Sequence, residues 1–151
     1  MKLTILSTNH YGRSVEMVFE DLKIGMSYSM TKEFTSNEVE EFSRLSMDVN
    51  PLHLDADYAA KSMFGRKIVH GFLSASLFSA IIGTKFPGEG SIYLSQNLSF
   101  LRPVFHGQNI TATVSVKELF PEKKRVLLET VCKDDQGNNL IEGTALVKLA
   151  E

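Results

Sequence analysis

Cysteine is nearly absent from this sequence, since Cys132 is the only one in 151 residues. A single thiol cannot form an intramolecular disulfide, which fits a protein of the reducing cytoplasm. Cys132 lies in a run of alternating polar and apolar residues. We therefore expect it to be a small buried apolar side chain rather than a reactive group.

Long hydrophobic runs and an excess of charge are also missing. No stretch approaches the ~20 apolar residues of a membrane span, and the apolar residues near the start are too few for the core of a signal peptide. The formal net charge is −2, without the basic surface of nucleic-acid-binding proteins or a polybasic run for anionic membranes. We expect a cytoplasmic protein whose partners are neither nucleic acids nor membranes.

The length fits one domain, because domains commonly contain ~100–150 residues. Such a chain can bury a hydrophobic core without disulfides or a structural metal. We interpret residues 1–14 as an N-terminal extension of uncertain order and residues 15–151 as a single domain.

Residues 26–60 predict a strand and two short helices. Alternation over 26–34 is typical of a strand, and Thr35 with Glu38 has the spacing of a helix-capping box. Pro51 disfavours helical dihedrals at the residue before it, so the chain must leave the first helix between residues 47 and 50. Asp55 is a plausible N-cap for a second helix. The expected apolar stripe of the first helix consists of Val39, Phe42 and Leu45.

The remainder predicts one buried helix followed by strands. From Gly71 to the residue before Lys85 every side chain is apolar or small, and a helix without a polar face is usually buried. After Gly90 the sequence alternates in segments separated by short turns, which favours antiparallel strands. The fold class is therefore α+β, with a sheet wrapped around one helix. Pairing in a dimer would cover the edges of such a sheet.

Asp48 and His53 are the residues most suited to chemistry. On a continuous helix they would point in different directions, but a bend at Asn50 and Pro51 permits them to meet. A carboxylate and an imidazole around one water can exchange protons near neutral pH. The alternative is that Asp48 and Asn50 are ordinary turn residues and that His53 only binds a backbone group.

A metal site is the less favoured interpretation of residues 53–57, which read His-Leu-Asp-Ala-Asp. Metal sites usually need three or more suitable ligands. The other histidines, His10, His70 and His106, are each isolated in the sequence. We therefore expect no metal ion.

The start of the helix at Gly71 offers a second feature. N–H groups of the first turn lack intrahelical partners and lie at the positive end of the helix dipole, where they can stabilise an oxyanion. Alternatively, Gly71 only permits tight packing. Ser79, on the same helix, either bonds back to a helix carbonyl or orients a catalytic carboxylate.

These stretches together resemble one family. Residues 48–53 read Asp-Val-Asn-Pro-Leu-His, which is similar to the hydratase 2 motif of MaoC-like, (R)-specific enoyl-CoA hydratases. Residues 68–71, the continuation to Ser79 and residues 91–100 resemble the same family. The resemblance covers about residues 25–149 and points to the short bacterial form that makes (R)-3-hydroxyacyl-CoA for polyhydroxyalkanoate synthesis.

The resemblance implies a hot-dog fold and a homodimer with thioester tunnels near the subunit interface. It implies that Asp48 and His53 are the catalytic pair, that the Gly71 backbone N–H polarises the thioester carbonyl, and that Ser79 supports the aspartate. It also implies that Ile82 and Val147 line the acyl pocket. No metal or redox cofactor is needed, because the CoA thioester is the substrate.

Several points stay open beside this resemblance. The family usually has glycine or an acidic residue where this chain has Met47, whose bulk could reshape the site. The same residues would serve a 3-hydroxyacyl-[acyl carrier protein] dehydratase. A thioesterase, whose usual motif differs, and a non-catalytic acyl-CoA-binding or scaffold protein are further alternatives. The candidate contacts for the CoA phosphates are Arg66, Lys67, Lys85 and Arg102.

Overall fold

One antiparallel sheet and one long helix make up the body of the protein. The computed structural model describes residues 17–149, so the extension expected at residues 1–14 lies outside the described part. The strands are β1 (Ser27–Glu33), β2 (Ser91–Phe100), β3 (Asn109–Phe120), β4 (Arg125–Asp134) and β5 (Asn139–Leu149), and their order in the sheet is β1-β3-β4-β5-β2. All neighbours are antiparallel. The predicted α+β architecture is confirmed.

The strands bury alternate residues against the helix. In β3 the even-numbered residues from Ile110 to Val116 are 3 % exposed or less, which is the period-2 pattern of a sheet with one covered face. Cys132 of β4 is fully buried, and burial raises the pKa of its thiol to about 12. The thiol is therefore part of the core, as expected.

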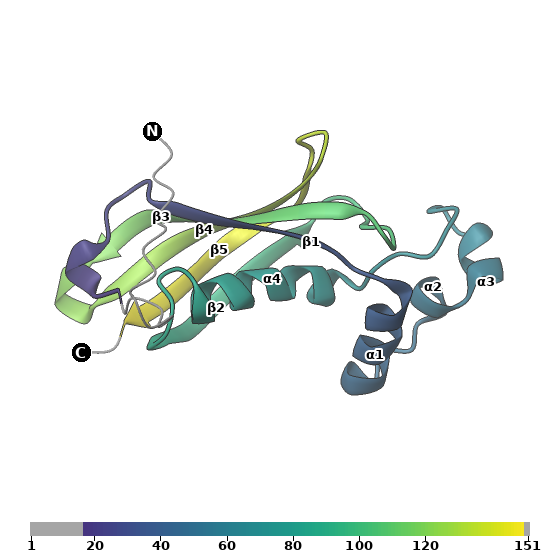
Figure 1. Ribbon diagram of the computed structural model, residues 1–151, viewed down its shortest axis with the longest axis horizontal. Helices are drawn as coiled ribbons and strands as arrows, with labels where there is room; N and C mark the ends of the chain where they lie inside the picture. Colours follow the sequence, from purple (N-terminus) through teal and green to yellow (C-terminus); the bar gives the residue numbers. More distant parts are fainter. Residues whose placement is uncertain (1–16, 150–151) are drawn as a thin grey trace, which may run out of the picture.

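Helix α4 (Gly71–Thr84) lies along one face of the sheet (Figure 1). Its inner side chains, such as Phe78 and Ile81, are at most 1 % exposed. Phe72, Ser76 and Ser79 are exposed on the other side. The predicted packing of this helix against the sheet is confirmed, and one side of the helix stays exposed in a single chain because the sheet covers only the other side.

Three short helices lie beyond one end of the sheet (Figure 1): α1 (Ser36–Ser46), α2 (Pro51–Leu54) and α3 (Ala56–Ala60). We call residues 36–60 the helical arm. The predicted capping box is present, since the Thr35 hydroxyl accepts from the Glu38 N–H and the Glu38 carboxylate accepts from the Thr35 N–H. The predicted apolar stripe is only partly buried, because Val39 is fully buried whereas Leu45 is 68 % exposed.

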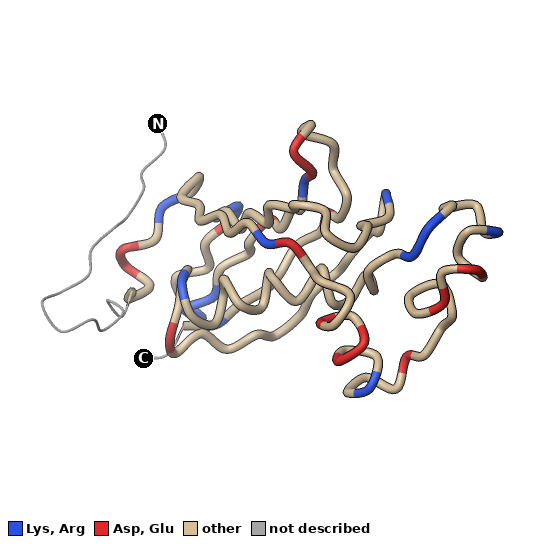
Figure 2. Tube along the Cα trace, turned by 45° about the vertical axis from the view of Figure 1, so that its right-hand side comes forward, with Lys and Arg blue, Asp and Glu red and all other residues tan. Residues whose placement is uncertain are grey.

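Acidic residues predominate in the helical arm, whose one cation is Arg44, whereas both signs of charge are spread over the body (Figure 2). Two short 3-10 helices, Phe19–Asp21 and Pro121–Lys123, complete the described elements. Within residues 17–149, no helix has the length and apolar character needed to cross a membrane.

Candidate active site

A tight reversal after α1 brings Asp48 beside His53. Met47 adopts a left-handed conformation with φ of 64° and ends α1. The Asp48 carboxylate then accepts from the Asn50 N–H at 3.2 Å, and the Asn50 side chain caps α2 by accepting from the Leu52 N–H at 3.0 Å. Proline suits the first position of a helix, so Pro51 begins α2. Side-chain atoms of Asp48, His53 and His70 lie within 4.8 Å of one another.

One ring nitrogen of His53 is hydrogen-bonded to the backbone, and the other can act as a base. Its Nδ1 lies 2.8 Å from the Ile68 carbonyl oxygen. Because a carbonyl only accepts, Nδ1 must carry the proton, and Nε2 of the neutral ring therefore has the lone pair. The backbone contact considered as an alternative role for His53 does exist, and it leaves a base free on the opposite nitrogen.

His70 is the residue of this site that the sequence did not reveal. Its ring stacks on His53 with centroids 3.7 Å apart and 28° between the planes. Its Nε2–H donates to the Asp48 carbonyl oxygen at 3.0 Å and lies 3.1 Å from the Ser43 hydroxyl. The Phe42 ring contacts it edge-on at 4.9 Å. His70 is therefore isolated in the sequence but lies beside Asp48 and His53 in the folded chain.

A signal for His70 was present in the sequence. It is a polar residue between the apolar Val69 and a buried helix, and a polar side chain at such a position needs hydrogen-bond partners. What the sequence lacked was the location of those partners, since Ser43 and Asp48 belong to the helical arm.

Burial favours the neutral form of His70. Desolvation is the main cause that lowers the pKa of His70, the hydrogen bond to the Asp48 carbonyl opposes this shift, and the nearby His53 adds to it. A neutral His70 with a proton on Nε2 leaves Nδ1 as an unprotonated acceptor, and this atom is buried without a partner among the described residues.

Two imidazoles and one carboxylate are ligand types that transition metals accept. Here one nitrogen of each ring is already bonded to a backbone carbonyl. The remaining nitrogen of His70 is buried, whereas the Asp48 carboxylate is exposed. The three groups therefore differ in exposure and in the nitrogens that are free to bind. This arrangement suits proton transfer better than binding of a metal ion.

Gly71 begins α4 directly after His70. A Cβ atom at this position would lie 2.6 Å from Cε1 of Phe100, so a larger residue would displace the Phe100 ring. Gly71 also lines a mostly apolar cavity of about 340 Å³, together with residues from 64–74 and 100–104 and Ile141. The packing role and the oxyanion role of Gly71 are thus compatible.

A single chain does not bring the other expected site residues to Asp48. Ser79 is exposed and lies eight residues after Gly71, which is ~12 Å along the helix. Ile82 and Val147 are 1 % and 0 % exposed in the core and line neither described cavity. Met47 is 83 % exposed and does not fill these cavities either.

Comparison with known proteins gives concordant results. The profile of the family described as "MaoC like domain" matches residues 20–137. An (R)-specific enoyl-CoA hydratase of Rhodospirillum rubrum is 46% identical over 129 residues, covering 85% of this chain and 89% of the relative. A 3-hydroxyacyl-[acyl-carrier-protein] dehydratase of Solanum lycopersicum is 36% identical over 147 residues, covering 96% and 88% of the two chains.

A solved structure confirms the hot-dog fold. The (R)-hydratase of Aeromonas caviae involved in PHA biosynthesis superposes with a TM-score of 0.85 at 46% identity, covering 87% of this chain and 99% of that one. Since both the sequence profile and the fold match over most of the chain, the protein belongs to the family of MaoC-like dehydratase domains.

Proposed function

We propose that this protein is an (R)-specific enoyl-CoA hydratase, which adds water to a trans-2-enoyl-CoA and forms (R)-3-hydroxyacyl-CoA. The observation that carries the proposal is the meeting of Asp48 with a His53 whose Nε2 is free, beside the start of α4. The hydratase relatives support the same reaction. The single buried cysteine favours the cytoplasm as the location.

The proposed reaction uses the two side chains as an acid and a base. Nε2 of His53 takes a proton from a water molecule while the water oxygen bonds to Cβ of the enoyl thioester. Protonated Asp48 gives its proton to Cα. The proton on His53 then returns to the Asp48 carboxylate, so the pair is restored and the net change is the addition of one water.

Negative charge develops on the thioester oxygen during this addition. We assign its stabilisation to the Gly71 N–H at the positive end of α4. Loss of one such donor typically costs ~3–4 kcal/mol of transition-state stabilisation. No metal or redox cofactor is required for this chemistry.

His70 acts as a positioning residue in this proposal. Its stacked ring and its hydrogen bond to the Asp48 carbonyl hold the base and the acid at a fixed separation. Since burial lowers the pKa of His70, it does not place a second positive charge beside His53 when His53 takes up the proton from water.

We further infer a homodimer, in which Ser79 of one copy supports Asp48 of the other. Two observations favour it: Ser79 lies on the open side of α4, and the edge strand β2 exposes Ile92 and Leu94 at 51 % and 42 %. Edge strands with apolar residues commonly pair with another chain. The acyl chain would enter between α4 and the sheet, next to Ile82 and Val147.

The nearest rival is dehydration of 3-hydroxyacyl chains on acyl carrier protein, because a relative with that name matches 96% of this chain. The same residues would catalyse it, so only the carrier of the thioester separates the two. A non-catalytic acyl-CoA-binding protein would bind enoyl-CoA without consuming it.

Hydration of crotonyl-CoA, followed by the loss of absorbance of the conjugated thioester, tests the proposal. Asp48→Asn and His53→Ala should each lower kcat by at least ~10²-fold and leave the unfolding transition intact. Asp57→Asn, an exposed carboxylate of the same helical arm, is the matched control and should retain activity. Near-normal turnover in either site variant, or an (S)-configured product, would refute the assignment.

A further inference from the structure

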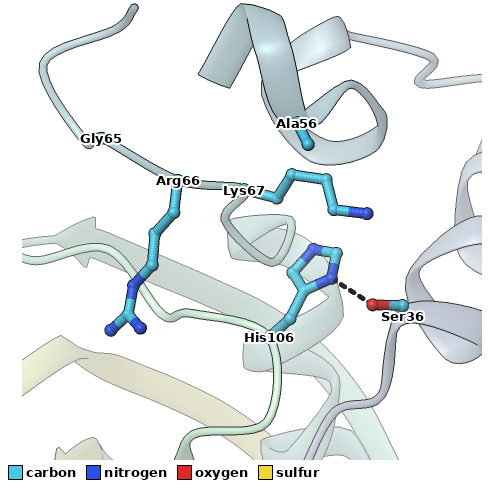
Figure 3. A pocket seen from close by; sticks show the side chains of 6 residues that line it. All are labelled: Ser36, Ala56, Gly65, Arg66, Lys67 and His106. Carbon is cyan, nitrogen blue, oxygen red and sulfur yellow. Dashed lines mark hydrogen bonds between the residues drawn. The ribbon is translucent and has the colours of Figure 1, made fainter. Parts of the chain in front are cut away.

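A second cavity, of about 230 Å³, lies beside the candidate active site, and the imidazole of His106 forms part of its wall (Figure 3). His106 belongs to the turn before β3 and is half-buried. The side chains of Arg66 and Lys67 extend to opposite sides of its ring (Figure 3). The proposed reaction does not use this imidazole. The full lining of the cavity is Ser36, Ala56, Gly65, Arg66, Lys67 and His106.

Two hydrogen bonds hold the His106 ring in one tautomer. Its Nε2 lies 3.3 Å from the Ile68 carbonyl oxygen, and its Nδ1 lies 2.9 Å from the Ser36 hydroxyl (Figure 3). Because a carbonyl only accepts, Nε2 carries the proton, and the Ser36 hydroxyl donates to Nδ1. Burial is the main cause that lowers the pKa of His106, the bond to the Ile68 carbonyl opposes this shift, and the charges of Lys67 and of the two nearby histidines add to it. The neutral ring is therefore favoured.

The Ile68 carbonyl oxygen is an acceptor that His106 shares with the proposed catalytic base. Nδ1–H of His53 donates to the same oxygen at 2.8 Å. A carbonyl oxygen has two lone pairs, so it can accept both bonds. The tautomer of His53 depends on this oxygen, since the bond keeps the proton on Nδ1 and leaves Nε2 as the base. A residue that holds the Ile68 carbonyl in place therefore acts on His53.

The peptide unit that carries this carbonyl is held on both sides. Its N–H, which is that of Val69, donates to the Val104 carbonyl at 2.7 Å. The two bonds to its oxygen come from His53 and His106. Residues 61–70 lie outside the helices and strands, apart from one bridge between Ile68 and Phe105. His106 is thus the restraint on this oxygen that is independent of the base itself.

His106 also joins the Ile68 carbonyl to the start of the helical arm. Ser36 is the first residue of α1, whereas His53 lies in α2. The arm is therefore connected to one carbonyl oxygen twice, at its first residue through His106 and again directly through His53. This double connection favours a single position of His53 relative to the start of α4, three residues after Ile68.

We propose that His106 is a positioning residue, which holds the Ile68 carbonyl in place and so keeps the proton of His53 on Nδ1 and the lone pair on Nε2. This inference rests on the proposed function, in which His53 is the base, and adds a residue that acts through it. One hydrogen bond between neutral groups typically corresponds to a ~3- to 10-fold effect on an equilibrium. We expect a contribution of that size from His106.

NMR of protein labelled with ¹⁵N in histidine tests the effect on His53 directly, because the ring ¹⁵N shifts distinguish the two neutral tautomers. At about pH 8.5, His53 of the wild type should be almost entirely the Nδ1–H tautomer. His106→Leu keeps a side chain of similar size without a donor, and the share of the Nε2–H tautomer of His53 should rise ~3- to 10-fold. His106→Gln, whose amide N–H can replace Nε2–H, should restore the wild-type shifts.

The same variants should change the hydration of crotonyl-CoA in parallel. We expect kcat of His106→Leu to fall ~3- to 10-fold with KM nearly unchanged, because the base is less well oriented, and kcat to recover in His106→Gln. Gln108→Ala is the matched control. The Gln108 side chain accepts from the Phe105 N–H at 3.0 Å in the same turn, and this bond does not involve the Ile68 carbonyl. The control should keep the wild-type tautomer and kcat per folded molecule.

Three results would overturn the positioning role. Unchanged ¹⁵N shifts of His53 in His106→Leu would show that the Ile68 carbonyl does not depend on His106. An equal change in Gln108→Ala would indicate a general loosening of the turn, and a loss of kcat that glutamine does not restore would mean that the donor is not what matters. If the wild type turns over no thioester, the proposed function fails separately, and the NMR comparison still decides whether His106 fixes the tautomer of His53.

Discussion

The body and the helical arm of this protein are built on different physical principles. In the body, five strands pair in register and bury alternate apolar residues against α4. In the arm, Leu45, Val49 and Tyr58 are all more than half exposed. The arm is shaped by caps and turns, such as the Thr35–Glu38 capping box and the Asn50 cap of α2.

The candidate chemistry lies where these two regions meet. Asp48 and His53 come from the arm, whereas Ile68 and His70 come from the segment that enters the body. Polar contacts join them: His53 to the Ile68 carbonyl, and His70 to the Asp48 carbonyl. We infer that the body provides most of the stability and that these contacts provide the geometry of the site.

The strongest test of this division is Leu128→Ala in the centre of the body. Leu128 is fully buried in β4, and such truncations typically cost 2–5 kcal/mol of unfolding free energy. We expect a loss in that range by urea denaturation. Leu45→Ala, in the exposed part of α1, is the control and should change stability by less than about 0.5 kcal/mol. Equal losses in the two variants would show that the arm is as tightly packed as the body.

His70→Asn tests the contacts between arm and body. The substitution removes the stacked ring and leaves buried polar partners unsatisfied, which typically costs ~1–3 kcal/mol. We expect kcat for crotonyl-CoA to fall ~10- to 100-fold because the catalytic groups shift, with a smaller change in KM. Steady-state kinetics and urea denaturation measure the two effects.

Two further variants separate the contributions of His70. His70→Phe keeps an aromatic ring against His53 but has no N–H donor, whereas His70→Gln keeps a donor for the Asp48 carbonyl but has no ring. If the hydrogen bond positions the acid, kcat recovers in the glutamine variant more than in the phenylalanine variant. Wild-type kcat in both would exclude a positioning role.

The same comparison explains what the sequence could predict. The strands of the body follow from alternation, and the starts of α1 and α3 follow from the caps at Thr35 and Asp55, because these signals are local. Helix α2 (Pro51–Leu54) was not predicted. The burial of Cys132 follows from the same alternation. The exposed side of α4 could not be predicted, because it depends on how far the sheet extends around the helix.

The residues of the candidate site could also be predicted only where the signal is local. Asp48 and His53 were found because they share one short motif with Pro51 between them. His70 was missed because its partners Ser43 and Asp48 are 27 and 22 residues away. Contacts over such separations are set by the fold, and no local pattern reports them.

Acidification should lower the free energy of unfolding through the histidines that lie between the body and the helical arm. The pKa values of His70 and His106 are lowered from about 6.5 by burial, so below pH 6.5 the unfolded chain takes up protons that the folded chain does not. The free energy of unfolding should therefore decrease as the pH falls from 6.5 toward the lowered pKa values. Urea denaturation at pH 7.5 and 5.5 measures this loss, which should be smaller in His70→Gln than in the wild type. An identical pH dependence in the two proteins would contradict the role given to His70.

The smallest expected effect concerns the turn that connects α1 to the site. Met47 has a left-handed backbone with φ of 64° and an 83 % exposed side chain. Left-handed conformations cost most residues ~1–2 kcal/mol, and asparagine tolerates them better. Met47→Asn should therefore stabilise the protein by up to ~1 kcal/mol with little change in kcat, as measured by urea denaturation and crotonyl-CoA hydration. If kcat instead fell while stability rose, Met47 would contribute to the site through its side chain, and the arm would be more than a scaffold for Asp48.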